Sequence, residues 1–312
     1  MSSLAARLPA DRSARTLLGA GLAALGLAFG MKEGAAHLAQ TWASSPTYHH
    51  GALVPLVSAY LIWLGWRAGD RPQAWPLAVI GAACAAVTYG VGSALDARVL
   101  HHVGVAGFVL AAATALLGRT LAIRHRFALG FLLFMVPFGE SLVPPLREVT
   151  ARGIMLMTDL FGVLALRRGM EIVTPAGVFE VAEACAGLRF VIASGVMGVL
   201  CAHLFFTHVR KQALMIAACL VVPVVANVLR AGGTVLIASA TDMRVAAGAD
   251  HLFYGWGFFV IVTGAIVLTA LRLSDARAPQ RPDPALSAPP RRGDPLLVGA
   301  ATGGLGLLAG LI

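Results

Sequence analysis

The chain has 312 residues, of which 58% are hydrophobic and 12% are charged, and its mean hydropathy is +0.80. A soluble domain cannot bury that much apolar side chain, so lipid must be the solvent for most of it. The formal net charge of +9 is carried by short basic clusters between apolar runs. That distribution is typical of an oriented membrane protein and argues against nucleic acid as a partner.

Eight apolar runs are long enough to cross a bilayer as helices. In chain order they are residues 16–31, 51–66, 75–93, a run ending near residue 117, 127–143, 188–206, a run starting at residue 212, and 251–271. The first run is preceded by basic residues but shows no small-residue cleavage site, so it is interpreted as a span and not as a signal peptide. The sequence therefore predicts an all-α polytopic membrane protein with about eight transmembrane helices.

Basic residues cluster before the first run, between the second and third, the fourth and fifth, and the sixth and seventh runs, and after the eighth. These connections alternate, so they all lie on one side, which the positive-inside rule makes cytoplasmic. The segment 144–187 then lies on the outer side, although it carries four arginines of its own.

The outer segment contains two further predicted elements. From residue 146 to 166, apolar residues recur at helical spacing with charged residues between them, which predicts an amphipathic helix on or re-entering the outer leaflet. Residues 171–180 contain two β-prone stretches around Pro175-Ala176-Gly177, a turn signal. We expect a short hairpin before the sixth span, with an irregular loop as the alternative.

The chain divides into three parts by composition. Residues 1–272 form the membrane domain, and residues 273–294 form a flexible cytoplasmic linker that is rich in Pro and Arg. Residues 295–312 are apolar and barely long enough to span a bilayer. They are interpreted either as a ninth span or as the start of an additional domain.

Cys185 lies where a polar, turn-rich segment meets the sixth run, in Glu183-Ala-Cys185-Ala-Gly187-Leu-Arg189. A thiol at a helix start is near unpaired backbone N–H groups and the positive end of the helix dipole, which favour thiolate. Gly187 has no side chain that would crowd the backbone beside the thiol, and Arg189 adds a positive charge. These features are typical of a nucleophile, although a small packing residue is the alternative.

The remaining metal-ligand candidates do not form a convincing site. Cys84, Cys201 and Cys219 fall inside apolar runs, where we expect packing residues. The pairs His49-His50 and His101-His102 both lie in external connections, but adjacent side chains point apart on a helix or a strand. We therefore expect no metal and no cofactor.

Asn227 and Arg230 lie three apart in the seventh run and share one helix face. An arginine inside an apolar run normally faces a polar cavity. At 1.5 Å per residue, Arg230 lies roughly 27 Å from the start of the run, near the outer surface. A snorkelling arginine would explain that position too, but snorkelling is not open to Asn227.

His251 opens the eighth run on the outer side, so the topology places it at the depth of Cys185 and Arg230. A lone interfacial histidine is also common without any catalytic role. A thiol, an imidazole and a guanidinium at one depth are nevertheless the minimum set for acyl transfer. The thiol attacks a carbonyl, the imidazole exchanges protons, and the guanidinium stabilises the oxyanion.

At these residues the sequence resembles the exosortase family, in particular the exosortase A branch found with exopolysaccharide genes of Gram-negative bacteria. The resemblance covers roughly residues 16–272, and its strength is the order and spacing of the motifs. The motifs are Glu183-Ala-Cys185-Ala-Gly187-Leu188-Arg189, Asn227-Val-Leu-Arg230, His251-Leu-Phe-Tyr254-Gly255-Trp256, Ser45-Pro-Thr-Tyr-His-His50-Gly51 and Phe134-Met-Val-Pro137.

The resemblance implies a transpeptidase of the cell inner membrane whose active site faces the periplasm. Its expected substrates are exported proteins with a C-terminal Pro-Glu-Pro signal, an apolar helix and a basic tail. Their acyl acceptor is unknown. By position, Cys185 is the nucleophile, Arg230 the transition-state stabiliser and His251 the acid/base, and Asn227, Glu183 and Arg189 are supporting residues. One departure is Ala186, where many relatives have Ser. Some relatives carry an additional C-terminal domain, of which the segment after Pro295 could be the start.

Two other functions fit the same residues. With water as the acceptor, the protein would be an intramembrane thiol protease. A carrier or scaffold for polysaccharide export would use Arg230 to contact an anionic lipid-linked substrate without covalent catalysis. Transporters usually show internal repeats and broken helices near mid-membrane. The sequence shows no repeat, so we favour the enzyme.

Overall fold

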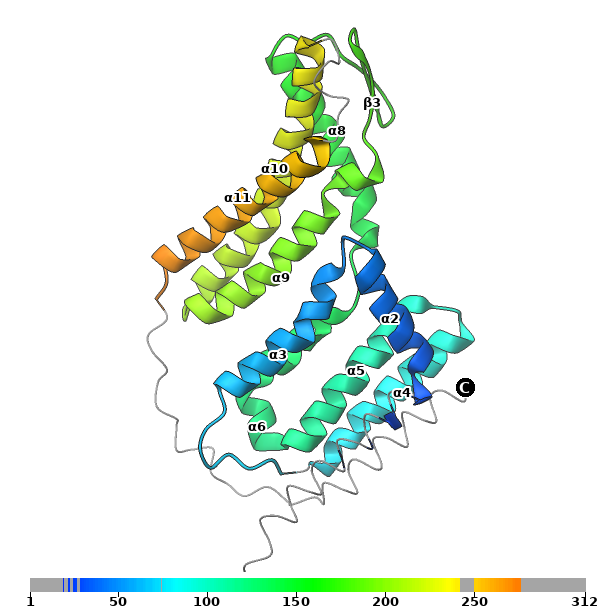
Figure 1. Ribbon diagram of the computed structural model, residues 1–312, viewed down its shortest axis with the longest axis vertical. Coiled ribbons are helices and arrows are strands. Elements are labelled where there is room, and N and C mark those ends of the chain that lie inside the picture. The colour runs from blue at the N-terminus through cyan, green and yellow to red at the C-terminus, as the bar shows by residue number, and fades with distance from the viewer. Residues whose placement is uncertain are drawn as a thin grey trace, which may run out of the picture. The chain divides into compact units, whose positions relative to one another are not determined.

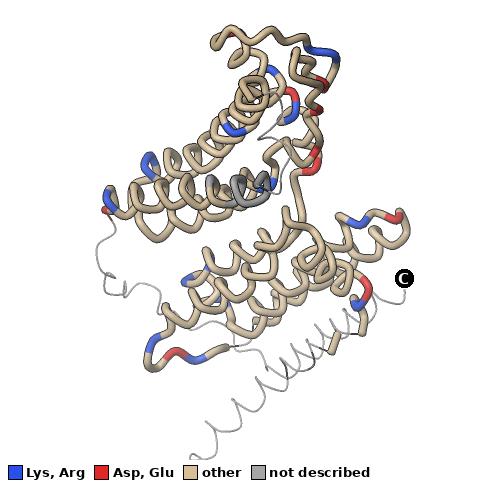
Figure 2. Tube along the Cα trace, turned by 45° about the horizontal axis from the view of Figure 1, so that its top comes forward, with Lys and Arg blue, Asp and Glu red and all other residues tan. Residues whose placement is uncertain are grey.

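The computed structural model describes residues 19, 22, 25, 26, 29–73, 75–241 and 250–275, and describes the backbone alone for residues 250–256 and 258. The chain forms two compact units, one reaching Phe138 and the other beginning at Gly139. Both are built mainly of helices (Figure 1). Charged residues lie mostly at helix ends and in connections (Figure 2).

The first unit is a helical bundle. Its helices are α2 (Lys32–Ser44), α3 (Leu53–Leu64), α4 (Val79–Ala94), α5 (Arg98–Leu117), α6 (Arg119–Arg124) and α7 (Arg126–Phe131), with 3-10 turns η1 (His49–Ala52), η2 (Pro76–Ala78) and η3 (Leu132–Met135). Tyr89 of α4 holds α2 and α5 together. Its hydroxyl accepts a hydrogen bond of 3.1 Å from the backbone N–H of Gly34, and its backbone lies directly against Gly104.

The second unit positions the candidate site. It contains the 3-10 turn η4 (Glu140–Leu142), α8 (Val143–Leu160), β1 (Leu166–Arg168), β2 (Glu171–Thr174), β3 (Gly177–Glu180), the 3-10 turn η5 (Glu183–Ala186), α9 (Leu188–Phe205), α10 (Val209–Ala240) and α11 (Asp250–Arg272). The amphipathic helix predicted for residues 146–166 is present as α8, but it ends at Leu160 and Leu166 belongs to β1. The continuous span predicted for residues 127–143 is wrong, because the chain is not helical at residues 136–139. Pro137 lacks a backbone donor, and Gly139 adopts the left-handed conformation with φ +94°.

The described residues contain four helices that are long and apolar enough to cross a membrane, or five if the helices on either side of residues 136–139 form one broken span. The four are Pro76–Ala94, Arg98–Leu117, Glu183–Phe205 and Val209–Ala240, and two shorter apolar helices cover His49–Leu64 and Phe259–Arg272. The protein is thus a mostly helical polytopic membrane protein. Eight spans are not confirmed, and most of the first predicted run lies outside the described residues.

The hairpin predicted around Pro175-Ala176-Gly177 is present as β2 and β3. A further strand, β1, was not predicted, and the sheet order is β1-β2-β3 with both pairs antiparallel. In the second pair, Ile172 lies opposite Phe179 and Glu171 opposite Glu180. The pairing continues one step beyond β3, where the N–H of Val181 donates to the carbonyl of Met170 at 2.9 Å.

Arginine and glutamate side chains fix the sheet to α8. The Nε of Arg147 donates to the carbonyl oxygen of Val181 at 2.8 Å. The carboxylate of Glu148 accepts hydrogen bonds from Arg152 on its own helix and from Arg167 of β1, at 2.7 and 2.5 Å. Three of the four arginines in the predicted outer segment therefore take part in bonds that stabilise its fold.

The long helix α10 exchanges one packing partner for another along its length. Its 32 residues give a length of about 48 Å, compared with about 30 Å for a bilayer core. The first part packs closely on α9, where a Cβ at Gly198 would lie 2.5 Å from that of Cys219. The later part packs on α8, where a Cβ at Gly153 would lie 2.2 Å from Val228. Asn227 and Arg230 lie at the point along α10 where the packing partner changes from α9 to α8.

Asp275 joins the C-terminal ends of α9 and α11 to the N-terminal end of α10, at the ends of these helices that lie away from Cys185. Its carboxylate accepts a hydrogen bond of 2.9 Å from the N–H of Thr207 and pairs with Lys211 at 3.0 Å. The Thr207 bond, aided by Lys211, holds the pKa of Asp275 below its usual value. Because α9 and α11 end together here, they also begin toward the same end of the unit.

Candidate thiol site

Cys185 lies in η5, immediately before α9, so the polar-to-helix junction predicted for it is confirmed. The thiol precedes the first helical residue, Leu188, by three positions and is not within the first turn. Gly187 links the two elements in the left-handed conformation with φ +77°, and a Cβ there would lie 2.7 Å from the side-chain carbon Cγ of Asn227. Only glycine fits both constraints. Cys185 itself is a free, half-buried cysteine.

Asn227 connects the thiol segment to the guanidinium of Arg230. Its Nδ2 donates to the carbonyl oxygen of Cys185 at 2.9 Å and to Oγ1 of Thr150 at 3.2 Å. Its Oδ1 accepts a hydrogen bond from Nη2 of Arg230 at 3.1 Å. The side chain is only 3% exposed, so these bonds form away from solvent and hold three elements in register.

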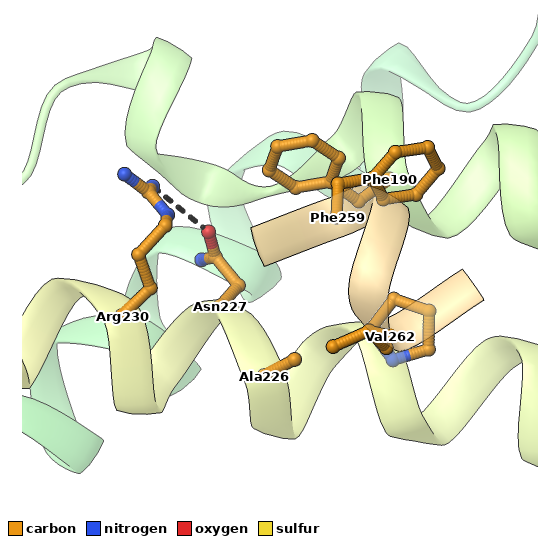
Figure 3. A pocket seen from close by; sticks show the side chains of 7 residues that line it. Phe190, Ala226, Asn227, Arg230, Phe259 and Val262 are labelled. Carbon is orange, nitrogen blue, oxygen red and sulfur yellow. Dashed lines mark hydrogen bonds between the residues drawn. The ribbon is translucent and has the colours of Figure 1, made fainter. Parts of the chain in front are cut away.

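Arg230 is 5% exposed and is covered by protein. The snorkelling explanation would require its guanidinium to reach outward, which this burial contradicts. Figure 3 shows Asn227 and Arg230 projecting from the same face of α10, beside the rings of Phe190 and Phe259. Those rings stack with centroids 4.8 Å apart. The cavity that these residues line is only about 10 Å³, no larger than a single water requires.

A larger pocket lies between the sheet, α8 and α10, and two of the three predicted reactive residues, Cys185 and Arg230, line it. Its volume is about 300 Å³. The lining residues are Ile154, Val178, Phe179, Glu180, Val181, Cys185, Arg230, Ala231, Thr234 and Val235. Cys185 and Arg230 therefore share one apolar-walled pocket, in which a fixed guanidinium interacts strongly with developing negative charge.

Arg189 and Glu183 occupy different surroundings. The guanidinium of Arg189 lies 4.6 Å from the ring centroid of Phe190 and is close enough to Arg230 and Cys185 to interact electrostatically with both. Its buried Nε has no hydrogen-bond partner among the described residues. Arg189 is thus a second cation near the thiol. Glu183 is exposed and forms no ion pair within the described part of the chain.

His251 belongs to the first turn of α11, but its side chain lies outside what the structure describes. At 1.5 Å per residue its backbone lies about 12 Å before Phe259, whose ring packs on Phe190 at the start of α9. α11 also begins toward the same end of the unit as α9. The approach of His251 to Cys185 stays a prediction.

The other histidines and cysteines have separate surroundings. His102 contacts His37, with Nε2 and Nδ1 2.9 Å apart, whereas the adjacent His101 stacks on Tyr89. Among the described residues, no three His, Cys, Asp or Glu side chains are grouped so as to hold a metal ion. Cys201 and Cys219 are buried as predicted. Cys84 is exposed on α4, so the prediction that it packs inside the protein is wrong.

Thr150 is a site residue that the sequence reasoning missed. It is 1% exposed, its Oγ1 donates to the carbonyl of Leu146 at 2.9 Å, and the same oxygen accepts the Asn227 bond. A threonine that bonds to the preceding helical turn is common, so it gave no signal by itself. The informative pattern is the set of small residues Thr150, Ala151 and Gly153 on an otherwise bulky helix, which allows α10 to approach closely.

The fold and the site together define a polytopic membrane protein with a half-buried thiol and a buried guanidinium in one pocket. The chain matches the family model of the transmembrane exosortases over residues 42–268, more than two thirds of its length. It therefore belongs to the exosortase family, a family of membrane cysteine transpeptidases. No curated protein and no solved structure matches the chain.

Proposed function

We propose that the protein is a cysteine transpeptidase of the bacterial inner membrane that cleaves C-terminal sorting signals of exported proteins. The signal consists of a Pro-Glu-Pro motif, an apolar helix and a basic tail, and the cleaved protein is transferred to a surface acceptor. The observation that carries this proposal is that Cys185 and Arg230 line the same pocket, with Asn227 bonded to both.

The proposed reaction is an acyl transfer in two steps. The Cys185 thiolate attacks the carbonyl carbon of the scissile peptide bond, and Arg230 stabilises the negative charge that develops on the carbonyl oxygen. The C–N bond then breaks, and His251 gives a proton to the leaving amine. The acceptor nucleophile then attacks the resulting thioester and gives its proton to His251, and it becomes acylated as the C–S bond breaks and the thiolate leaves. With water as the acceptor, the same chemistry is hydrolysis.

The proposed orientation places the pocket on the periplasmic side, with eight spans and cytoplasmic ends. Two features support it. The pocket lies where α10 leaves α9, about 27 Å along α10 from Gln212, which is close to the thickness of a bilayer core. The basic residues Arg210 and Lys211 lie at the opposite end of α10, as the positive-inside rule requires for a cytoplasmic end.

Replacement of the thiol tests the proposal. Cys185→Ala and Cys185→Ser should both abolish cleavage of a co-expressed Pro-Glu-Pro-tailed substrate, because a hydroxyl is far harder to ionise than a thiol. Cys201→Ala and Cys219→Ala are matched controls within buried helix contacts and should process the substrate. Mass spectrometry of the new terminus separates transfer from hydrolysis. Normal processing by both Cys185 variants would favour the carrier or scaffold function.

A further inference from the structure

Strand β3 is an edge strand beside the thiol pocket. In the described part of the chain the sheet has three strands, and β3 pairs with β2 on one side only. An edge strand presents backbone N–H and C=O groups that another extended chain can pair with. The apolar side chain of Val178 on this strand is 60% exposed.

The register identifies which backbone groups point away from the sheet. In an antiparallel ladder, opposite residues alternate between pairs that exchange hydrogen bonds and pairs that do not. The N–H of Val181 donates to the carbonyl of Met170, so Phe179 forms the next bonded pair, with Ile172. The residues between these pairs, Val178 and Glu180, therefore direct their N–H and C=O groups toward the free edge.

The pocket extends along this free edge. Its lining includes four consecutive residues, 178–181. Successive side chains point to opposite faces of a strand, so a pocket on one face would be lined mainly by the side chains of alternate residues. All four residues line the pocket and no residue of β2 does, which indicates that the pocket borders the unpaired side of β3. Ala231, Thr234 and Val235 of α10 form part of the remaining lining, together with Cys185 and Arg230.

We propose that an extended segment of the polypeptide to be cleaved adds to β3 as a fourth strand, with backbone hydrogen bonds to Val178 and Glu180. This inference rests on the proposed function and names how that site holds its substrate. A pocket of about 300 Å³ is too small for a helix of 10 Å diameter, whereas it can take a few extended residues. Pairing along β3 fixes the depth of the chain, so that a peptide carbonyl is presented to Cys185 and Arg230.

Removing one outward N–H tests the pairing. Val178→Pro deletes the donor and places a ring on the free edge, and the sheet tolerates it because that N–H does not bond to β2. Val178→Ala is the matched variant that keeps the donor. We expect Val178→Ala to process a co-expressed Pro-Glu-Pro-tailed substrate at least about tenfold faster than Val178→Pro. Equal processing by the two variants would overturn the proposal.

Two further measurements keep the test decisive. With the other three cysteines replaced by Ala, iodoacetamide should alkylate Cys185 at equal rates in both variants, because a small reagent needs no strand pairing. The other measurement is photo-crosslinking. A benzoylphenylalanine at position 178 in the Cys185→Ala protein should capture the substrate, whereas the same group at position 166 on β1 should not.

If Val178→Pro also loses alkylation, the cross-link decides between misfolding and lost docking. Absence of a cross-link at position 178 would overturn strand addition. The cross-link does not need the thiol, so it separates docking from catalysis. If the wild-type protein leaves the substrate uncleaved while position 178 captures it, the proposed function fails and the docking surface stands.

Discussion

Asn227 offers the sharpest test of how the site works, because its side chain contacts both reactive segments. Asn227→Ala removes the hydrogen bond that orients Nη2 of Arg230. A hydrogen bond to a charged group contributes about 2 kcal/mol, so processing should fall about thirtyfold. Arg230→Ala should cost about 3 kcal/mol in the barrier, or about a hundredfold in rate.

The double variant Asn227→Ala/Arg230→Ala distinguishes an Asn227 that acts by positioning Arg230 from one that acts independently of it. If Asn227 affects the rate by orienting Arg230, and not through its bond to the Cys185 carbonyl, then Asn227→Ala should add little once Arg230 is Ala, and the loss should stay near a hundredfold. Independent effects would add to about 5 kcal/mol, several thousandfold in rate. The expected coupling is therefore about 2 kcal/mol.

The assay is the initial rate of substrate cleavage in membranes that contain equal amounts of each variant. Protection of the buried thiols Cys201 and Cys219 from labelling reports that each variant is folded. Thr150→Val serves as the matched control, because it removes a neutral bond to Asn227 without touching Arg230. Thr150→Val should raise the barrier to cleavage by about 1 kcal/mol, which lowers the rate about fivefold. Additive losses in the double variant would refute the positioning argument.

Three further predictions follow from the same geometry. In single-cysteine variants, an impermeant thiol reagent applied to spheroplasts should label positions 185 and 251, and position 211 only after permeabilisation; the reverse pattern would invert the topology. Arg230→Lys should impair cleavage nearly as much as Arg230→Ala, because a point charge does not reproduce a planar two-pronged donor, and near-normal processing by the Lys variant would contradict that role. Gly187→Ala should destabilise the protein by more than about 2 kcal/mol, since φ +77° is unfavourable for alanine and its Cβ would overlap the buried side chain of Asn227. The measurement is the temperature at which the buried thiols Cys201 and Cys219 become reactive, and an unchanged temperature would contradict the prediction.

Local sequence patterns determined much of the outcome. Hydropathy identified a membrane protein, and the turn signal at Pro175-Ala176-Gly177 identified the hairpin, because both depend on neighbouring residues only. The polar pair Asn227 and Arg230 was recognisable for the same reason, since a polar face within an apolar run has few structural explanations. The link between this pair and Cys185 was predicted from topology; Arg230 and Cys185 line one pocket, and Asn227 is hydrogen-bonded to both residues.

The tertiary structure decided which helix faces are covered. In lipid, apolar side chains are equally suitable against acyl chains and against protein, so hydropathy does not distinguish the two environments. That is why Cys84 was expected to be packed and is exposed, and why Thr150 was overlooked although it is buried. The partners of Asn227 come from α8 and η5, 77 and 42 residues away along the chain. Such contacts arise from close helix approach at residues like Gly153 and Gly187, and they convert separate local signals into one site.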